Sequence, residues 1–168
     1  TGISRTHEDL SLSSVGANCT TEGSFDFDVQ GHGTHVAGII SAQDNSFGVA
    51  GLAPKISLHS VKVLDDSGYG YVSDIIEGLY WAQTNQLQIV NMSLGTLSNS
   101  ISLEAACEAA KAAGLLLVVA AGNREDNSVN NVFYPAKYAS VLAVSASDQR
   151  NQIADFSCRG PEIDIIAP

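Results

Sequence analysis

The chain has 168 residues, of which 45% are hydrophobic and 15% are charged, and its formal net charge is −10. This composition supports a buried core and excludes a disordered chain. No apolar run reaches the roughly 18 residues that a membrane span needs, and no basic cluster favours nucleic acid as a partner.

Helical and strand patterns alternate along the chain, which is typical of an α/β domain with a mostly parallel sheet. In chain order we predict a helix over 32–42, a strand over 56–64, a helix over 73–84, a strand over 88–92, a helix over 102–113, and strands over 115–120, 141–146 and 163–166. Val, Ile and Leu dominate the strands, which favours strands covered on both faces. Residues 11–30 and 124–132 are predicted to be polar loops.

The boundaries of the third helix and the cysteines follow from local chemistry. Ser100 or Ser102 is expected to cap this helix at its start, and Gly114 to end it. Cys107 falls on the apolar face of the helix and is predicted to belong to the core. The other two cysteines, Cys19 and Cys158, form no Cys-x-x-Cys motif with it, so neither a zinc knuckle nor a redox pair is indicated.

Most of the carboxylates fall in the predicted loops. They include Glu22, Asp26, Asp28, Asp44, Asp65, Asp66, Glu125 and Asp126. We interpret them as a solvated surface that keeps the protein soluble. The alternative is that part of this acidity binds calcium.

The run Gly31-His32-Gly33-Thr34-His35 places two histidines at the start of the first predicted helix. A general base needs a fixed position and a pKa near neutrality, and a histidine held by the first turn of a helix meets the first need. His35 lies one turn further on and is predicted to pack against the domain as a structural histidine. The spacing would also suit two zinc ligands, but the sequence offers no His-Glu-x-x-His motif and no obvious third ligand nearby.

Two further motifs each follow an apolar strand. Ala120-Ala121-Gly122-Asn123 ends in an amide that can donate to a developing oxyanion, or that can simply occupy a turn. Asn91-Met92-Ser93-Leu94-Gly95 continues beyond its strand, and such an edge can pair with an extended peptide. An ordinary loop is the alternative for this second motif.

Taken in order, these motifs resemble the subtilisin-like serine peptidases, the subtilase family, over nearly all of residues 1–168. The resemblance implies a three-layer α/β sandwich with a mostly parallel, doubly wound sheet, in which 1–168 form part of a single peptidase domain. It implies a serine endopeptidase that hydrolyses peptide bonds in proteins by a Ser-His-Asp triad. His32 takes the position of the catalytic base and Asn123 that of the oxyanion donor. An α/β small-molecule binder is disfavoured, because no strand is followed by Gly-x-Gly-x-x-Gly.

The resemblance also assigns the residues that bind substrate. These are Ser93, Leu94 and Gly95 on one edge, Tyr69, Gly70 and Tyr71 on an opposing edge strand, and Ala121, Gly122 and Phe133 at the pocket for the side chain that precedes the cut. In the family a glycine at the position of Phe133 leaves a deep slot. Phe133 therefore either fills this slot, which favours small substrate side chains, or turns into the core and leaves the slot open.

A structural calcium site is implied by the same resemblance. Its expected ligands are the backbone carbonyls of Gln43, Phe47 and Val49, the side-chain amide of Asn45 and the carboxylate of Asp9. Ligands that are all oxygen atoms suit calcium, and a plain surface turn is the alternative. A second, weaker cation site is placed at Ala136, Tyr138, Val141 and Asp164.

Two of the three triad positions are not found in this sequence. The chain opens with Thr1-Gly2-Ile3, which matches the family's Asp-Thr-Gly-Ile without its Asp, and it ends before the Gly-Thr-Ser-Met-Ala motif. We therefore expect the N-terminal strand with the catalytic Asp and the C-terminal segment with the catalytic Ser to be missing, the fold to be incomplete and the chain alone to be inactive. The alternative is an inactive fragment or pseudoenzyme that retains a peptide-binding cleft.

The remaining expectations come from what is typical of members of this family. The resemblance predicts an extracellular monomer that acts on protein or peptide substrates, with a propeptide or a protein inhibitor as a further partner. Because this sequence does not open with a basic and apolar stretch, we expect no targeting segment within it.

Overall fold

The computed structural model describes residues 1–124 and 131–168. Six residues of the predicted 124–132 loop therefore lie outside the described part of the chain. The chain divides into two compact units, Thr1–Trp81 and Ala82–Pro168. No helix in the described residues is long and apolar enough to cross a membrane.

The first unit contains β1 (Ala17–Asn18), α1 (His32–Ser41), β2 (Val61–Lys62) and the start of α2 (Val72–Thr84). Both helices form where the sequence predicts them. The strand predicted over 56–64 is shorter, because only Val61–Lys62 pairs with β1, in parallel. Before β1 the partner segment bends, with the Ser13 hydroxyl accepting the Val15 N–H at 3.1 Å. The bend interrupts the ladder and leaves an isolated bridge from Leu12 to Leu58.

The core of this unit is small. It consists of the buried side chains of Ile3, Leu10, Ala37 and Leu58, with Leu12 packed against them. Ala37 belongs to α1, so this cluster fixes the inner face of the helix whose first residue is His32.

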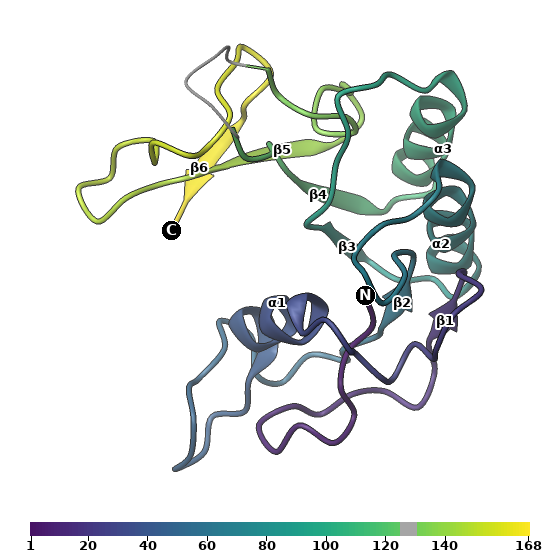
Figure 1. The fold of residues 1–168 in the computed structure, drawn as a ribbon, viewed down its shortest axis with the longest axis vertical. Helices are drawn as coiled ribbons and strands as arrows, with labels where there is room; N and C mark the ends of the chain where they lie inside the picture. Colours follow the sequence, from purple (N-terminus) through teal and green to yellow (C-terminus); the bar gives the residue numbers. More distant parts are fainter. Residues whose placement is uncertain (125–130) are drawn as a thin grey trace. The chain divides into compact units, whose positions relative to one another are not determined.

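The second unit is built on a four-stranded parallel sheet, shown in Figure 1 with α3 beside it. Its elements are β3 (Ile89–Met92), α3 (Ile101–Ala112), β4 (Leu116–Ala120), β5 (Leu142–Ala146) and β6 (Ile165–Ala167). The strand order is β3-β4-β5-β6, and every neighbouring pair is parallel. The predicted α/β class with parallel strands is confirmed, because each of these strands and α3 form at the predicted places.

The predicted cap and core residue of α3 are confirmed. The Ser100 hydroxyl accepts the Leu103 N–H at 3.3 Å, and Gly114 follows the helix with a left-handed φ of 94°. Cys107 is fully buried on the inner face, next to Leu103. Burial raises the pKa of the Cys107 thiol to about 12, so this cysteine is a neutral core side chain.

The expectation that the strands are covered on both faces is wrong for β4. Leu117 and Val119 are fully buried, whereas the alternate residue Leu116 is 47% exposed. Successive side chains of a strand point to opposite faces, and α3 packs against β4. The apolar run therefore behaves as a half-buried strand within this unit.

Candidate functional site

The entrance to α1 is shaped by two glycines. Gly31 precedes the helix in the left-handed region, with a φ of 87°, where side chains other than glycine are strained. Gly33 lies directly against the carbonyl oxygen of Gly2, where a Cβ atom would clash. Between them His32 is the first residue of α1, and its side chain is exposed. The second glycine thus serves close backbone packing within the unit.

A carboxylate holds this first turn. Asp28 accepts the Gly31 N–H at 3.0 Å, the Thr34 N–H at 2.8 Å and the Thr34 hydroxyl at 2.7 Å. Burial alone would raise the pKa of Asp28, but hydrogen bonds from Thr34, Thr1 and Gly31 outweigh it and lower this pKa below its usual value. The interpretation of Asp28 as part of a solvated acidic surface is therefore wrong.

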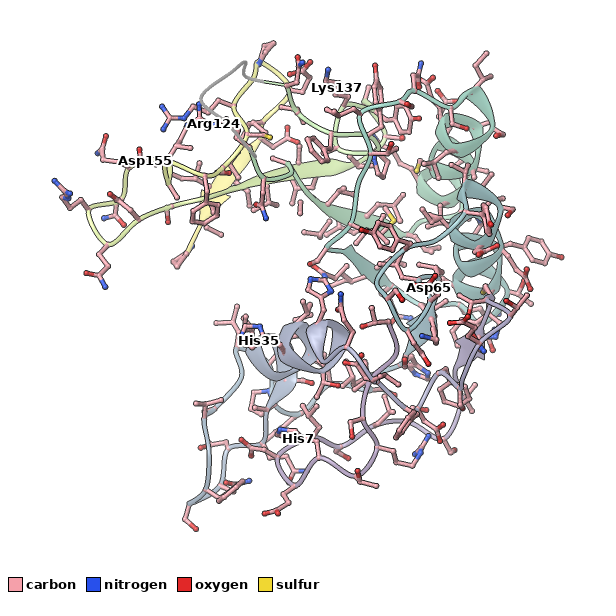
Figure 2. All side chains as sticks on the ribbon, viewed as in Figure 1. His7, His35, Asp65, Arg124, Lys137 and Asp155 are labelled. Atoms are coloured by element: carbon pink, nitrogen blue, oxygen red, sulfur yellow. The ribbon has the colours of Figure 1, made fainter. Side chains whose placement is uncertain are left out.

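His35 is exposed, which corrects the prediction that it packs as a structural histidine. The buried residues of α1 are Ala37 and Ser41, one turn apart. Residue 35 lies two positions before Ala37, and two residues of an α-helix turn it by about 200°. Its side chain therefore points away from the buried face (Figure 2). In the described residues no group of three His, Cys, Asp or Glu side chains could hold a metal ion.

The residues expected to bind calcium gather around Asp9, which is 2% exposed. Its Oδ1 accepts the amide N–H of Asn45 at 3.0 Å, and its Oδ2 accepts the Val49 N–H at 3.1 Å. Its carbonyl accepts the Gln43 N–H at 2.9 Å. The Phe47 N–H donates to the Asn45 amide oxygen at 2.7 Å. The loop 43–49 is thus folded onto one buried carboxylate.

The Asp9 carboxylate and the Asn45 amide oxygen are ligand types that suit calcium, but the Asn45 amide would have to turn over, which would release the Phe47 N–H from its oxygen. With the Asn45 nitrogen facing Asp9, the carboxylate is satisfied by N–H donors. With the amide turned over, its oxygen would face a carboxylate oxygen across the same 3.0 Å. Two oxygens at that separation repel each other unless a cation lies beside both. Among the described residues no ion pair neutralises Asp9.

Residues 69–71 form no strand in the described part of the chain. The Asp65 carboxylate accepts the Tyr69 N–H at 2.9 Å, which closes a turn ahead of this segment. The Tyr71 carbonyl accepts the Asp74 N–H at 3.1 Å, which begins α2. Tyr69 and Tyr71 are 76% and 78% exposed. Both tyrosines are therefore open to solvent, and the pairing of this segment with a peptide stays a prediction.

In the second unit Asn123 follows β4 and has an anchored backbone. It forms an antiparallel bridge to Ser157. The Arg124 N–H donates to the Phe156 carbonyl at 2.7 Å, and the Arg124 guanidinium donates to the Asp155 carbonyl at 3.2 Å (Figure 2). The Asn123 side chain itself is exposed. An anchored backbone with an open amide is what an oxyanion donor requires.

Phe133 lies against both glycines of the predicted pocket. A Cβ on Gly122 would be 2.6 Å from Cγ of the ring, and a Cβ on Gly95 would be 2.9 Å from the Phe133 Cβ. The Phe133 N–H donates to the Ala121 carbonyl at 2.8 Å. Gly95 continues from Ser93 and Leu94, which belong to no strand in the described residues. The structure thus brings Gly95, Ala121, Gly122 and Phe133 together.

Sequence reasoning missed two polar residues that shape the first unit. Lys62 is fully buried, and its ammonium donates to the Thr1 carbonyl at 2.9 Å and pairs with Asp66 at 2.9 Å. The signal for it was a lysine within an apolar strand. Asp28 was the second, and its signal was an acidic residue shortly before a helix start.

Comparisons with known proteins identify the family of this chain. The family model of the Subtilase family matches residues 1–168. Subtilisin DY from Bacillus licheniformis is 46% identical over the whole chain, and a thermostable alkaline protease from Halalkalibacterium halodurans is 49% identical over the whole chain. The minor extracellular protease Epr from Bacillus subtilis is 45% identical over 96% of the chain. The chain spans 61%, 45% and 25% of the lengths of these three relatives.

A solved structure of a subtilisin-like protease has the same fold. The psychrophilic subtilisin-like protease from an Antarctic Pseudoalteromonas superposes with a TM-score of 0.86 at 34% identity, covering 99% of this chain and 39% of that one. The chain therefore belongs to the subtilase family of serine peptidases.

Proposed function

We propose that the full-length protein is a serine endopeptidase in which residues 1–168 supply the general base and the oxyanion donor. The observation that carries this proposal is His32, exposed at the first position of a helix whose entrance is fixed by hydrogen bonds. Family membership supports the same conclusion. Asn123, exposed on an anchored backbone, supports the second role.

The chemistry divides between these two side chains. His32 takes the proton of the nucleophilic serine as it attacks the peptide carbonyl, and then gives it to the leaving amine. The Asn123 amide donates a hydrogen bond to the oxygen that becomes negatively charged. The backbone around His32 and the backbone around Asn123 are each held by contacts within their own unit, so little reorganisation of either is needed during the reaction.

The substrate is proposed to be an extended segment of a protein or peptide. Ser93, Leu94 and Gly95 offer one backbone edge, and Tyr69, Gly70 and Tyr71 the other. Ala121, Gly122 and Phe133 receive the side chain that precedes the cut. An extracellular site of action is proposed as well, and the name of the Bacillus subtilis relative supports it.

Calcium is proposed as a structural ion held by Asp9 and the 43–49 loop. Bound there, it would supply the positive charge that the buried carboxylate lacks among its described contacts. The ion would tie the loop to the segment that carries Asp9, and it would take no part in the reaction.

Activity is proposed to need the full-length protein. Residues 1–168 contain no serine in a Gly-Thr-Ser-Met-Ala or Gly-x-Ser-x-Gly context. A base and an oxyanion donor without a nucleophile cannot form the covalent intermediate.

The test uses the full-length protein and a serine-directed organophosphorus reagent. His32→Ala should abolish both peptide turnover and labelling without lowering the melting temperature, because the His32 side chain is exposed. His59→Gln is the matched control, since His59 bonds Val15 and Ser57 elsewhere in the same unit. Turnover and labelling that persist in the His32→Ala variant would contradict the proposal.

A further inference from the structure

The structure assigns to Asp28 the role of a positioning residue for His32. Its carboxylate holds the peptide groups on both sides of the histidine, at Gly31 and at Thr34. This inference rests on the proposed function of His32 as the base.

Both oxygens of the Asp28 carboxylate accept hydrogen bonds from the turn around His32. Oδ1 accepts the Gly31 N–H at 3.0 Å, while Oδ2 accepts both the N–H of Thr34 at 2.8 Å and its hydroxyl at 2.7 Å. The surrounding contacts complete the restraint, because the Thr1 hydroxyl accepts the Gly33 N–H at 3.0 Å. The Ser4 N–H donates to the Thr34 hydroxyl at 2.9 Å. The turn around His32 is therefore tied by side chains rather than by the helix alone.

Glycine makes this restraint necessary. Gly31 adopts a φ of 87° just before the histidine, and a glycine moves between left-handed and right-handed conformations at little cost. Rotation at Gly31 would swing the His32 side chain, because the Gly31–His32 peptide sets the direction of its Cα–Cβ bond. The hydrogen bond from Gly31 to Asp28 supplies the restraint that a Cβ atom would otherwise provide.

The charge of Asp28 strengthens these bonds. Although burial opposes ionisation, the hydrogen bonds from Thr34, Thr1 and Gly31 lower the pKa of the Asp28 carboxyl. It is therefore ionised at neutral pH, and hydrogen bonds to an ionised acceptor are shorter and stronger than neutral ones. A negative charge next to a helix N-terminus is also favourable.

The hydrogen bonds from Gly31 and from Thr34 to the Asp28 carboxylate together form a clamp, and Asp28→Asn separates its two halves. The amide of the variant has one accepting oxygen and one donating nitrogen. If its oxygen serves Thr34, its nitrogen faces the Gly31 N–H, and the bond to Gly31 is lost. Asp26→Asn is the matched control, because Asp26 bonds Arg5 at 2.9 Å and Ser24 at 2.5 Å and makes no bond to α1. Both variants remove one negative charge from the same loop.

The kinetic arm measures kcat and KM of the full-length enzyme, per active site titrated with an organophosphorus reagent. We expect D28N to lower kcat about tenfold to hundredfold and to change KM by no more than about twofold, because a base displaced by about 1 Å loses that much rate. D26N should leave both constants within about twofold of the wild type. If D28N lowered only the number of titratable active sites and left kcat per site unchanged, the role of Asp28 would be merely structural and the inference would be overturned.

The second arm does not depend on activity. Amide hydrogen exchange should show the Gly31 N–H exchanging about tenfold faster in D28N than in D26N, which is the loss of one hydrogen bond. If D28N does not fold, Thr34→Val against Thr34→Ser tests the same clamp, because only the valine removes the hydroxyl donor. Equal kcat in D28N and D26N, with an inactive His32→Ala variant, would refute the role of Asp28 alone. An active His32→Ala variant would refute the proposed function instead, and the exchange data would still report on the clamp.

Discussion

In the proposed full-length peptidase, Phe133 should restrict which side chain is accepted before the scissile bond. In the family a glycine at this position leaves a deep slot, and here a phenyl ring occupies the place. The structure shows the ring lying against the backbone of Gly122 and close to Gly95. We expect Phe133→Gly to open the slot and to shift the preference from small side chains towards large ones.

The magnitude follows from the space that the ring leaves. A single added carbon on Gly122 would lie 2.6, 2.7 and 3.0 Å from three ring atoms, and one on Gly95 would lie 2.9 and 3.3 Å from Phe133. Carbon atoms need about 3.5–4.0 Å, so not even a methyl group fits between the ring and these backbones. Overpacking of this kind costs about 1–3 kcal/mol, which corresponds to roughly fivefold to 150-fold in relative kcat/KM.

The assay compares peptides that differ only in the residue before the cut. The quantity measured is the ratio of kcat/KM for Phe to kcat/KM for Ala, because this ratio is independent of the fraction of folded enzyme. The wild type should favour Ala, Phe133→Gly should raise the ratio within the range above, and the matched variant Phe133→Leu should raise it much less because leucine keeps most of the volume. A wild-type enzyme that cleaves after Phe as well as after Ala, or an unchanged ratio in Phe133→Gly, would refute the blocked pocket.

Two further predictions concern stability. Removing calcium from the full-length protein should lower its melting temperature, since an ion at a hundredfold excess over its Kd contributes about 2.7 kcal/mol. Asp9→Asn should abolish this dependence while Asp44→Asn, an exposed carboxylate of the same loop, should preserve it; a melting temperature indifferent to a chelator would count against the site. Alkaline pH should also destabilise the fold, because burial raises the pKa of Cys107 to about 12. The stabilisation from a raised pKa is complete below the unfolded value, about 8.5, and is lost as pH rises towards the folded one. Melting temperatures recorded between pH 8 and 10.5 should therefore fall less for Cys107→Ala than for the wild type, and parallel curves would show that the thiol does not contribute.

The sequence predicts elements well where one periodicity dominates. The helix over Ile101–Ala112 and the strands of the second unit form where apolar residues recur at helical spacing or in short unbroken runs. The strand over 56–64 was predicted too long, because its length depends on a partner segment that bends at Ser13. The bend lies in the partner segment, so the apolar pattern of residues 56–64 does not predict it.

Polar residues in the site were harder to predict for a different reason. Lys62 and Asp28 look like surface charges in a sequence, but besides the Lys62–Asp66 pair they bond the Thr1 carbonyl and the N–H groups of Gly31 and Thr34. A bond between a charge and a backbone group leaves no complementary residue type to recognise. Asp9 was singled out only through the family resemblance, which supplied its partner loop from outside the local pattern, and its role as a calcium ligand stays a prediction.

The two histidines of α1 show what physical reasoning adds to a motif. His32 and His35 share one helix, and both side chains are exposed, so exposure does not single out a base. The difference lies in the backbone, because His32 sits in a turn whose amide groups at Gly31, Gly33 and Thr34 each have a side-chain acceptor. His35 lies past that turn, and its N–H makes the ordinary helical bond to the Gly31 carbonyl at 2.9 Å. A catalytic base must hold its direction against the proton it moves, and on α1 only the first histidine has a framework of that kind.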